Sequence, residues 1–469
     1  MTPLLLLLLA LGLVIAGVLV LRFPPFVVLI TAALVVATLT PPATVARQLA
    51  GAGDVADASA VPSASQRVAT GFGKTAGNVG IVIAMASILG ACLTAAGAAE
   101  RLVAAIQRLV GPENTPLALL LAGFVLGVPM FADTVFFLLL PLAQAASART
   151  GRHQLLNVMA IVAGVTMTHS LVPPTPGPLF VAETLQVDLA AMIGVGAVVG
   201  LVAAAAGFGY AWWADRRWQL VPAGREIAAT AAAAGTHPAA AGSEPLRSAS
   251  LGLAMLPLLL PVGLISLHSI AQSAPDLLPA AAAPLVEFLG DKNIALVLAA
   301  AAAVAVLATT GAGLPQIRTT LAEATLEAGG VLLVIAAGGA LGLALRQAGM
   351  AELAGGLSAG SGLWLIPAAW LITVVVRTAQ GSATVAMITA AGVVGPILLE
   401  GTSGCDPVYV AVAIGCGSKP GMWMNDSGFW VIARMSGLTE RQMLATVSTM
   451  LSVEGTVGLL VTLLLAAVW

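Results

Sequence analysis

Long apolar runs separated by short polar or charged breaks recur from one end of the chain to the other. The uninterrupted runs lie at 3–21, 25–41, 78–97, 190–213, 251–270, 291–309, 326–346 and 448–468. An α-helix needs about 20 apolar residues to cross the hydrocarbon core of a bilayer, and these runs are close to that length. The pattern therefore predicts an all-α polytopic membrane protein.

Further apolar regions are interrupted by polar residues, glycine or proline, and these lie at 115–146, 155–183, 363–398 and 407–433. Non-helical backbone is tolerated at membrane depth only where it is buried in protein or lines a water-filled cavity. We interpret 115–146 and 363–398 as re-entrant hairpins, and 155–183 and 407–433 as broken transmembrane helices. With this arrangement most arginines face one side, which the positive-inside rule assigns to the cytoplasm. Both termini and the polar segment 43–77 then lie outside.

The order of hairpin, broken helix and final span occurs twice along the chain. In addition, "AGAAERLV" (96–103) resembles "AGMAELAG" (348–355). Each half would hold an odd number of crossings, so the second half must be inverted relative to the first. We therefore predict a first inverted repeat at 1–213, a cytoplasmic linker at 214–250 and a second inverted repeat at 251–469. Inverted repeats with interrupted helices are typical of secondary transporters, whose sites lie at the breaks near the membrane midplane.

Composition excludes several other classes of protein. The 469 residues are 59% hydrophobic and 9% charged, whereas a soluble domain carries roughly a quarter charged residues. The net charge of −2 gives no electrostatic footprint for nucleic acid. The three cysteines show neither metal-ligand spacing nor a disulfide framework. Nucleotide-binding and metalloprotease motifs are missing from the sequence, so we expect no cofactor, no bound metal and no ATP-driven transport.

The tip of the second hairpin, "RTAQGSAT", combines the features of an anion site. Gly381 permits the turn, and Ser382 and Thr384 place hydroxyls at the start of the following helical arm. The N-terminus of that arm presents free N–H groups and the positive end of the helix dipole. Arg377 adds a fixed positive charge, and a charged residue inside the membrane has a functional or paired role by default. The alternative is an Arg377 side chain that reaches from a helix end to the membrane surface.

The first hairpin carries an acid at the equivalent point. In "GVPMFADTVFF" (127–137), Asp133 occupies the predicted tip. A carboxyl group in apolar surroundings can exchange a proton near neutral pH, which makes Asp133 a candidate for proton coupling. The alternative is that Asp133 only caps the second arm of the hairpin.

The first broken helix carries a polar cluster just before its break. Thr168, His169 and Ser170 precede the proline-rich stretch 173–178, which stops the helix and frees carbonyl groups. We expect these side chains to contact a substrate. His169 could carry a proton or donate a hydrogen bond to the substrate, and a structural histidine bonded to a neighbouring carbonyl is an equal alternative.

The second broken helix, "GCGSKPGMWMNDSGFW", has a similar cluster. Ser418 lies in the break and Asn425 and Asp426 follow it. We expect Ser418 and Asn425 to contact the substrate, while Asp426 is a second candidate for proton coupling or a partner of Lys419 or Arg377. Lys419 either contacts an anionic substrate or is locked to Asp426, and the sequence leaves both interpretations open.

At these motifs the chain resembles the gluconate:proton symporter family, part of the ion-transporter superfamily of organic-anion carriers. The resemblance covers most of the chain and is sharpest at "THSLVPPTPGP" (168–178), "VEFLGDKNIAL" (286–296), "GSATVAMITAAG" (381–392) and "NDSGFW" (425–430). It implies a secondary active transporter that takes up gluconate or a related sugar acid across the cell inner (cytoplasmic) membrane by symport with protons. The superfamily implies two re-entrant hairpins in inverted repeats, a homodimer and an elevator-type motion.

The resemblance also assigns positions to the central motif of the family. By resemblance the motif is inherited by Thr168, His169, Pro173, Pro174, Pro176, Gly177, Pro178, Gly381, Ser382, Thr384, Asn425 and Asp426. Asp133 stands where a Glu is expected, and Thr175 and Trp423 stand where a His is familiar. The stretch "SKPGMW" around Lys419 is a further departure from the family pattern.

Other functions are compatible with parts of this pattern. One is a sodium-coupled carboxylate transporter of the same fold, and another is a passive anion channel. A third is an intramembrane hydrolase with Ser382 as nucleophile and His169 as base, which the missing G-x-S-x-G elbow disfavours. We predict a transporter and not an enzyme, with a small organic anion, protons and the lipid bilayer as partners.

Overall fold

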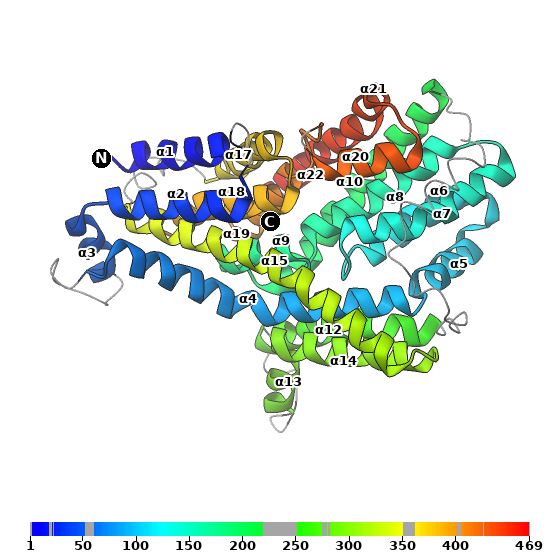
Figure 1. The fold of residues 1–469 in the computed structure, drawn as a ribbon, viewed down its shortest axis with the longest axis horizontal. Coiled ribbons are helices and arrows are strands. Elements are labelled where there is room, and N and C mark those ends of the chain that lie inside the picture. The colour runs from blue at the N-terminus through cyan, green and yellow to red at the C-terminus, as the bar shows by residue number, and fades with distance from the viewer. Residues whose placement is uncertain are drawn as a thin grey trace.

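The computed structural model describes residues 2–17, 21, 23–51, 61–218, 251–273, 279, 282–349, 362–400, 405–424 and 426–468. In this part of the chain the regular elements are all helices (Figure 1). By length and composition, 7 of these helices can cross a membrane, or up to 8 if a pair bent by 99° (Pro25–Leu39 and Pro42–Gln48) forms one span. The predicted class, an all-α polytopic membrane protein, is confirmed. The predicted linker lies outside the described residues except for its first positions, which belong to the end of a helix at Trp218.

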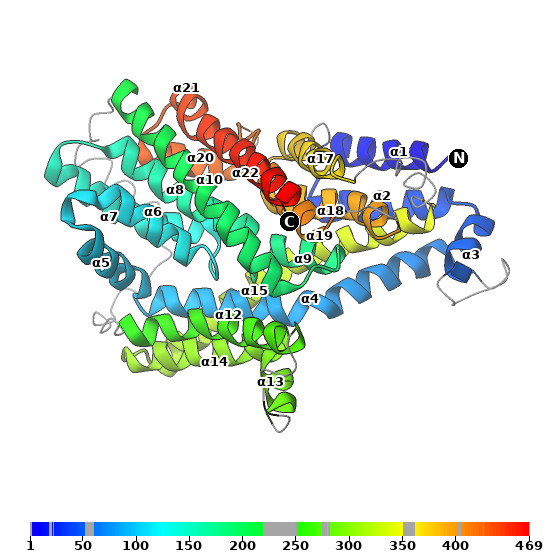
Figure 2. The same cartoon turned by 180° about the vertical axis from the view of Figure 1, so that it is seen from behind.

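Two long helices, α4 (Ala64–Ala95) and α15 (Leu314–Gln347), pack against each other across the molecule (Figure 1, Figure 2). On α15 lies α2 (Pro25–Leu39), while α14 (Lys292–Thr309) packs on α4 and α12 (Leu251–Ser273) packs on α14. We call these helices the long-helix group. The helices α1, α3, α5 and α13 have the bounds Pro3–Ile15, Pro42–Gly51, Ala98–Val110 and Ala283–Gly290.

The interrupted regions form a second group, the broken-helix group. Its members are α6 (Thr115–Leu126), α7 (Ala132–Thr150), α8 (Gln154–Leu171), α9 (Pro176–Thr184), α10 (Leu189–Trp218), α17 (Leu365–Gln380), α18 (Ala383–Glu400), α19 (Pro407–Gly417), α20 (Ser427–Ser436) and α22 (Thr449–Val468). The short helix α21 (Glu440–Met443) precedes α22. At the centre lies α8, which packs against α6, α7 and α10 and has every residue except Thr166 buried. A helix that is apolar on all sides is typically enclosed by others, and this one is.

Each region that the sequence predicts to be interrupted is interrupted. The residues 127–131 separate α6 from α7, and 172–175 separate α8 from α9, where prolines lack the N–H groups that a continuing helix needs. At the end of α17, Gly381 has a φ of 83°, a left-handed conformation that favours glycine. The helix α19 ends before Ser418. The re-entrant course of the hairpins and the inverted repeats stay predictions.

Two predicted boundaries are wrong. The segment 43–77 is largely helical where it is described, because it contains most of α3 and the first turns of α4. Ser63 and Gln66 form a capping box that starts α4 well before the apolar run begins. In the same way, α15 begins at Leu314 rather than near 326, with a proline in its first turn. Polar first turns extend both helices beyond the apolar stretch.

Arg67, in the first turns of α4, shows why this polar stretch can be helical and buried. Its guanidinium donates hydrogen bonds to Gln347 Oε1 (2.9 Å) at the end of α15 and to the carbonyl of Ala37 (2.6 Å) in α2. Partners from two distant helices therefore satisfy a charge that would otherwise need water.

The two helix groups meet where α15 crosses α18. A Cβ added at Gly338 of α15 would lie 1.9 Å from Cγ2 of Ile388 on α18, and the ring of Phe180 lies 3.8 Å from the same point. In the same contact Gly342 and Gly392 face each other. Small residues let helix backbones approach closely inside membranes, and this crossing leaves no room for a side chain at Gly338.

We expect Gly338→Ala to destabilise the protein and Gly330→Ala to leave its stability unchanged or slightly raised. Overpacking a tight contact typically costs about 1–3 kcal/mol. Gly330 lies on the same helix but has no atom within 4 Å of an added Cβ, so alanine there brings only its better helix propensity. Thermal unfolding of the two purified variants in detergent measures the difference, and equal unfolding temperatures would contradict the close packing.

Candidate functional site

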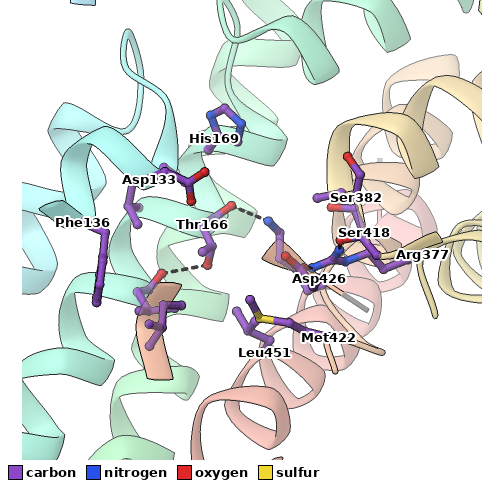
Figure 3. A pocket seen from close by; sticks show the side chains of 17 residues that line it. Asp133, Phe136, Thr166, His169, Arg377, Ser382, Ser418, Met422, Asp426 and Leu451 are labelled. Carbon is purple, nitrogen blue, oxygen red and sulfur yellow. Dashed lines mark hydrogen bonds and ion pairs between the residues drawn. The ribbon is translucent and has the colours of Figure 1, made fainter. Parts of the chain in front are cut away.

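A cavity of about 320 Å³ lies where the interrupted helices meet (Figure 3). This volume is at the lower end of the range of roughly 300–1,000 Å³ that small-molecule sites occupy. The polar and charged side chains that line it are those of Asp133, Thr166, His169, Arg377, Ser382, Ser418, Lys419 and Asp426. Figure 3 shows Asp133, Thr166 and His169 on one wall, and Arg377, Ser382 and Asp426 on the facing wall.

A buried ion pair joins two of the breaks. Arg377, at the end of α17, donates hydrogen bonds to the carbonyl of Gly381 and to Oδ2 of Asp426. The other carboxylate oxygen of Asp426 accepts from the N–H of Gly428 (2.7 Å), which caps α20. Arg377 is only 4% exposed, so it does not reach out to a membrane surface. Asp426 is therefore paired with Arg377 rather than with Lys419, and its role in proton coupling stays a prediction.

Lys419 has no carboxylate partner of this kind. Its Nζ donates to the carbonyl of Thr166 (2.6 Å) and to Oγ of Ser170 (2.5 Å), both on α8. None of the ion pairs among the described residues includes Lys419, and its side chain lines the cavity. The wall therefore presents a buried amine whose hydrogen bonds, within the described structure, go to neutral groups.

Asp133 lies in the first turn of α7 and is exposed to the cavity. It does not act as the cap of α7, because that helix begins after Phe131 without a side-chain hydrogen bond. Its Oδ1 and the Oδ1 of Asp426 lie 3.9 and 3.1 Å from the point where Gly428 would carry a Cβ. Two carboxyl groups from different breaks thus face the same small space.

The His169 side chain is buried on α8 and lines the cavity. Its ring centroid lies 5.9 Å from that of Phe131, and the ring also approaches the backbone of Met130 in the break after α6. Its Nδ1 has no hydrogen-bond partner within the described structure. A buried polar atom without a partner is uncommon, and here it lies beside a cavity that a ligand can fill.

The other predicted contact residues divide into two sets. Gly381, Ser382 and Ser418 line the cavity; the Ser382 hydroxyl accepts from the N–H of Val385 (3.4 Å) and the Ser418 hydroxyl donates to the carbonyl of Gly415 (2.7 Å). Thr168, Ser170 and Thr384 are not among the lining residues, and Asn425 lies outside the described residues.

The local contacts of Thr168 and Ser170 explain why they turn away from the cavity. The Thr168 hydroxyl bonds the carbonyl of Gly164 in its own helix (3.1 Å), and Ser170 accepts from Lys419. Ser382 and His169 both line the cavity, but Ser382 bonds Val385 rather than the imidazole, which is not the arrangement of a hydrolytic nucleophile and its base.

Sequence reasoning missed Glu454. This residue lies in α22, is completely buried, and contacts the hydroxyl of Thr166 through Oε2 (3.5 Å). The available signal was a lone acid within an otherwise apolar span, which is a functional indication by default. Gly455 and Thr456 follow it directly, but α22 continues through them without a break, whereas the other candidates lie at or near the ends of helices.

Comparison with known proteins agrees with this architecture. Residues 2–468 match the family described as GntP family permease. A permease of Haemophilus influenzae is 34% identical over 384 residues, covering 80% of this chain and 77% of the relative. A gluconate permease of Pseudomonas aeruginosa is 31% identical over 403 residues, covering 85% and 86%.

Among solved structures, the chain is similar in fold to the YdaH transporter of Alcanivorax borkumensis. The TM-score is 0.55 at 16% sequence identity, with 85% of this chain and 87% of that chain covered. This similarity concerns the fold alone. The match over nearly the whole length supplies the identity: the chain belongs to the GntP permease family and is a multi-pass membrane transporter rather than an enzyme.

Proposed function

We propose that the protein takes up gluconate or a related sugar acid across the inner (cytoplasmic) membrane by symport with protons. The observation that carries this proposal is Lys419, whose positive charge lines the cavity without a carboxylate partner among the described residues. A buried charge is costly unless it is paired, and a substrate carboxylate is the missing partner. The relative from Pseudomonas aeruginosa, a gluconate permease, supports a sugar acid as that substrate.

The remaining lining residues suit the rest of such a substrate. The carboxylate lies near Lys419, within reach of Ser418, and the start of α18 with Ser382 offers further donors. The imidazole of His169 bonds a substrate hydroxyl through its free Nδ1. The sequence also predicts substrate contacts for Asn425, Thr168 and Thr384. In this proposal these contacts form in another conformation of the protein.

Asp133 is the carboxyl group that meets the substrate directly. As an anion it repels both Asp426 and a substrate carboxylate in the same cavity. A proton on Asp133 removes both repulsions, so proton and substrate favour the same loaded state, which is the requirement for coupling. Asp426 is less suited to carry this proton because it is held by Arg377.

The movement that carries the loaded site across the membrane is of the elevator type. In this proposal the broken-helix group moves against the long-helix group, with 1–213 and 251–469 as inverted repeats and 115–146 and 363–398 as re-entrant hairpins. The cavity that the interrupted helices surround and the close crossing of α15 with α18 at Gly338 support it. A homodimer formed through the long-helix group completes the assembly.

Proteoliposomes that contain the purified protein test the function. We expect radiolabelled gluconate to accumulate inside when the outside is made acidic, equally with and without sodium. Accumulation that requires sodium would favour the sodium-coupled alternative, and equilibration without accumulation would indicate a channel. Liposomes without protein are the control, and no gluconate movement under any gradient would contradict the proposal.

Asp133→Asn should separate binding from coupling. The amide cannot exchange a proton but keeps the size of the side chain, so gluconate exchange between two loaded compartments should persist while acid-driven accumulation is lost. Asp291→Asn is the matched control, because Asp291 caps α14 away from the cavity and asparagine caps as well as aspartate. An Asp133→Asn protein that still accumulates gluconate like the wild type would remove Asp133 from the coupling mechanism.

The pair of Arg377 and Asp426 should behave as a buried structural brace. Removing one partner of a buried pair leaves an uncompensated charge and costs about 3–5 kcal/mol, whereas removing both is often close to neutral. We therefore expect Arg377→Met and Asp426→Asn each to lower the free energy of unfolding, and the double variant to recover most of the loss. Denaturant unfolding in detergent measures all three.

The partly exposed pair of Lys292 and Glu183 is the control for this brace. Their side chains are 22% and 30% exposed, and Nζ of Lys292 lies 2.5 Å from Oε2 of Glu183. Solvent-exposed pairs contribute about 0–1 kcal/mol, so Lys292→Met should have a small effect. Equal losses for Lys292→Met and Arg377→Met would contradict the structural importance of the buried pair.

A further inference from the structure

Glu454 is a completely buried acid that the proposed transport site does not yet use. It lies in α22, next to the cavity but not among its lining residues. Acids inside membrane-spanning helices are rare and mark functional pathways, because an unpaired charge there is costly. The surroundings of its two carboxyl oxygens indicate how the side chain is enclosed and which residue it acts on.

The space for the carboxyl group is made by a glycine on the neighbouring helix. A Cβ added at Gly207 of α10 would lie 2.0 Å from Oε1 of Glu454. This oxygen has no hydrogen-bond partner within the described structure. The carboxyl group is therefore enclosed against bare backbone, where an ionised form has few groups to stabilise it.

The other carboxyl oxygen contacts Thr166. The hydroxyl of Thr166 is 2.8 Å from the carbonyl of Val162 and 3.5 Å from Oε2 of Glu454. A hydroxyl has one hydrogen to donate, so the carbonyl of Val162 and the carboxyl group of Glu454 compete for it. The shorter bond to Val162 leaves Glu454 with only a long contact to Thr166.

Thr166 connects this acid to the cation of the cavity. Its carbonyl accepts from Nζ of Lys419 at 2.6 Å, while its hydroxyl contacts Glu454. Thr166 also lines the cavity itself, on the same wall as Asp133 and His169 (Figure 3). Lys419 and Glu454 thus contact one residue from two sides.

The other titratable groups near α22 are already engaged or lie elsewhere. On α10, Tyr210 donates to the carbonyl of Ala445 (2.8 Å) and Asp215 pairs with His153 (2.8 Å). The groups presented by the helices α8, α17 and α19 and the segment that follows α19 are His169, Arg377 with its partner Asp426, Cys416 and Lys419. Among these described groups, Lys419 is the cation that lacks an acidic partner.

We propose that Glu454 is a second proton carrier, which controls the charge that Lys419 offers to the substrate. When Glu454 is protonated, no protein carboxylate competes across Thr166 for the Lys419 side chain, and the substrate carboxylate is its acidic partner. When Glu454 loses its proton, its carboxylate balances Lys419 across Thr166, and the site no longer attracts an anion. This inference rests on the proposed function, in which the substrate is a sugar acid.

The arrangement couples proton and substrate without direct contact between them. A proton on Glu454 raises the affinity for the anion, and by linkage the bound anion favours the proton to the same extent. Asp133 acts on the substrate from within the cavity, whereas Glu454 acts through a fixed lysine behind its wall. The two carboxyl groups therefore contribute separately to the pH dependence of binding.

Gluconate binding by the purified full-length protein tests the inference. Affinity is measured calorimetrically at about pH 5 and about pH 8, where we expect the wild type to bind more tightly at the lower pH by about 5- to 150-fold. Glu454→Gln keeps the size and removes the exchangeable proton, so its affinity should stay high at both pH values and the ratio should shrink. Glu323→Gln makes the same change at an exposed position of α15 and should keep the wild-type ratio.

The outcomes separate this inference from the function on which it rests. A wild type that binds no sugar acid would overturn the proposed function itself. A folded Glu454→Gln protein with the wild-type ratio, or with weak binding at every pH, would overturn only the role of Glu454. Should that variant fail to fold, Thr166→Val keeps the acid and removes its contact, and an unmoved pH midpoint of binding in this variant would equally overturn the inference.

Discussion

Polar groups that this chain buries away from water must find their partners inside the protein, and the rest of the structure depends on this constraint. A helix break frees N–H and C=O groups that lipid cannot satisfy. The breaks gather at one place because side chains at one break bond polar groups of another interrupted helix, as Arg377 does with Asp426. The carbonyl of Gly381 accepts from Arg377, the carbonyl of Thr166 accepts from Lys419, and the side chain of Asp426 caps α20. The cavity follows from this mutual satisfaction, since it is the space around which the breaks meet.

The charged residues around the cavity form a closed pair, Arg377 with Asp426, and an open set, Lys419 and Asp133. Arg377 and Asp426 neutralise each other and fix the geometry of two breaks, while contributing little net charge to the site. Lys419 and Asp133 remain without such partners among the described residues, and both line the cavity. A site in which every charge were paired would gain nothing from an anion or a proton. In the proposed symport, the open set is what lets ligand and proton change the relative stability of two conformations.

Local signals predict the breaks, whereas distant partners decide the contacts. Gly381 and the prolines at 173–178 interrupt helices through their own backbone properties, so their positions are readable from the sequence. The start of α4 also has a local signal, the capping box of Ser63 and Gln66, but the burial of Arg67 depends on Gln347, 280 residues away.

The same distinction holds within the site. Composition marks Arg377, Lys419 and Asp426 as unusual, but only the packing of α8 against the break after α19 directs Lys419 to Thr166, 253 residues away, and leaves Asp426 to Arg377. Glu454 escaped notice because its partner lies in another helix and its own helix continues unbroken through Gly455.

The unsatisfied atoms also indicate how such a site would discriminate between anions. Nδ1 of His169 and Oε1 of Glu454 have no partner within the described structure, and both lie close to the residues that hold Lys419. A plain carboxylate could pair with the lysine but would leave the imidazole unbonded. A sugar acid brings hydroxyls as well, and leaving a buried polar group unpaired is more costly than the net contribution of an ordinary hydrogen bond. Sites built to bond hydroxyls reject analogues that lack them for this reason, so the proposed contact of His169 with a substrate hydroxyl would favour sugar acids over plain carboxylates.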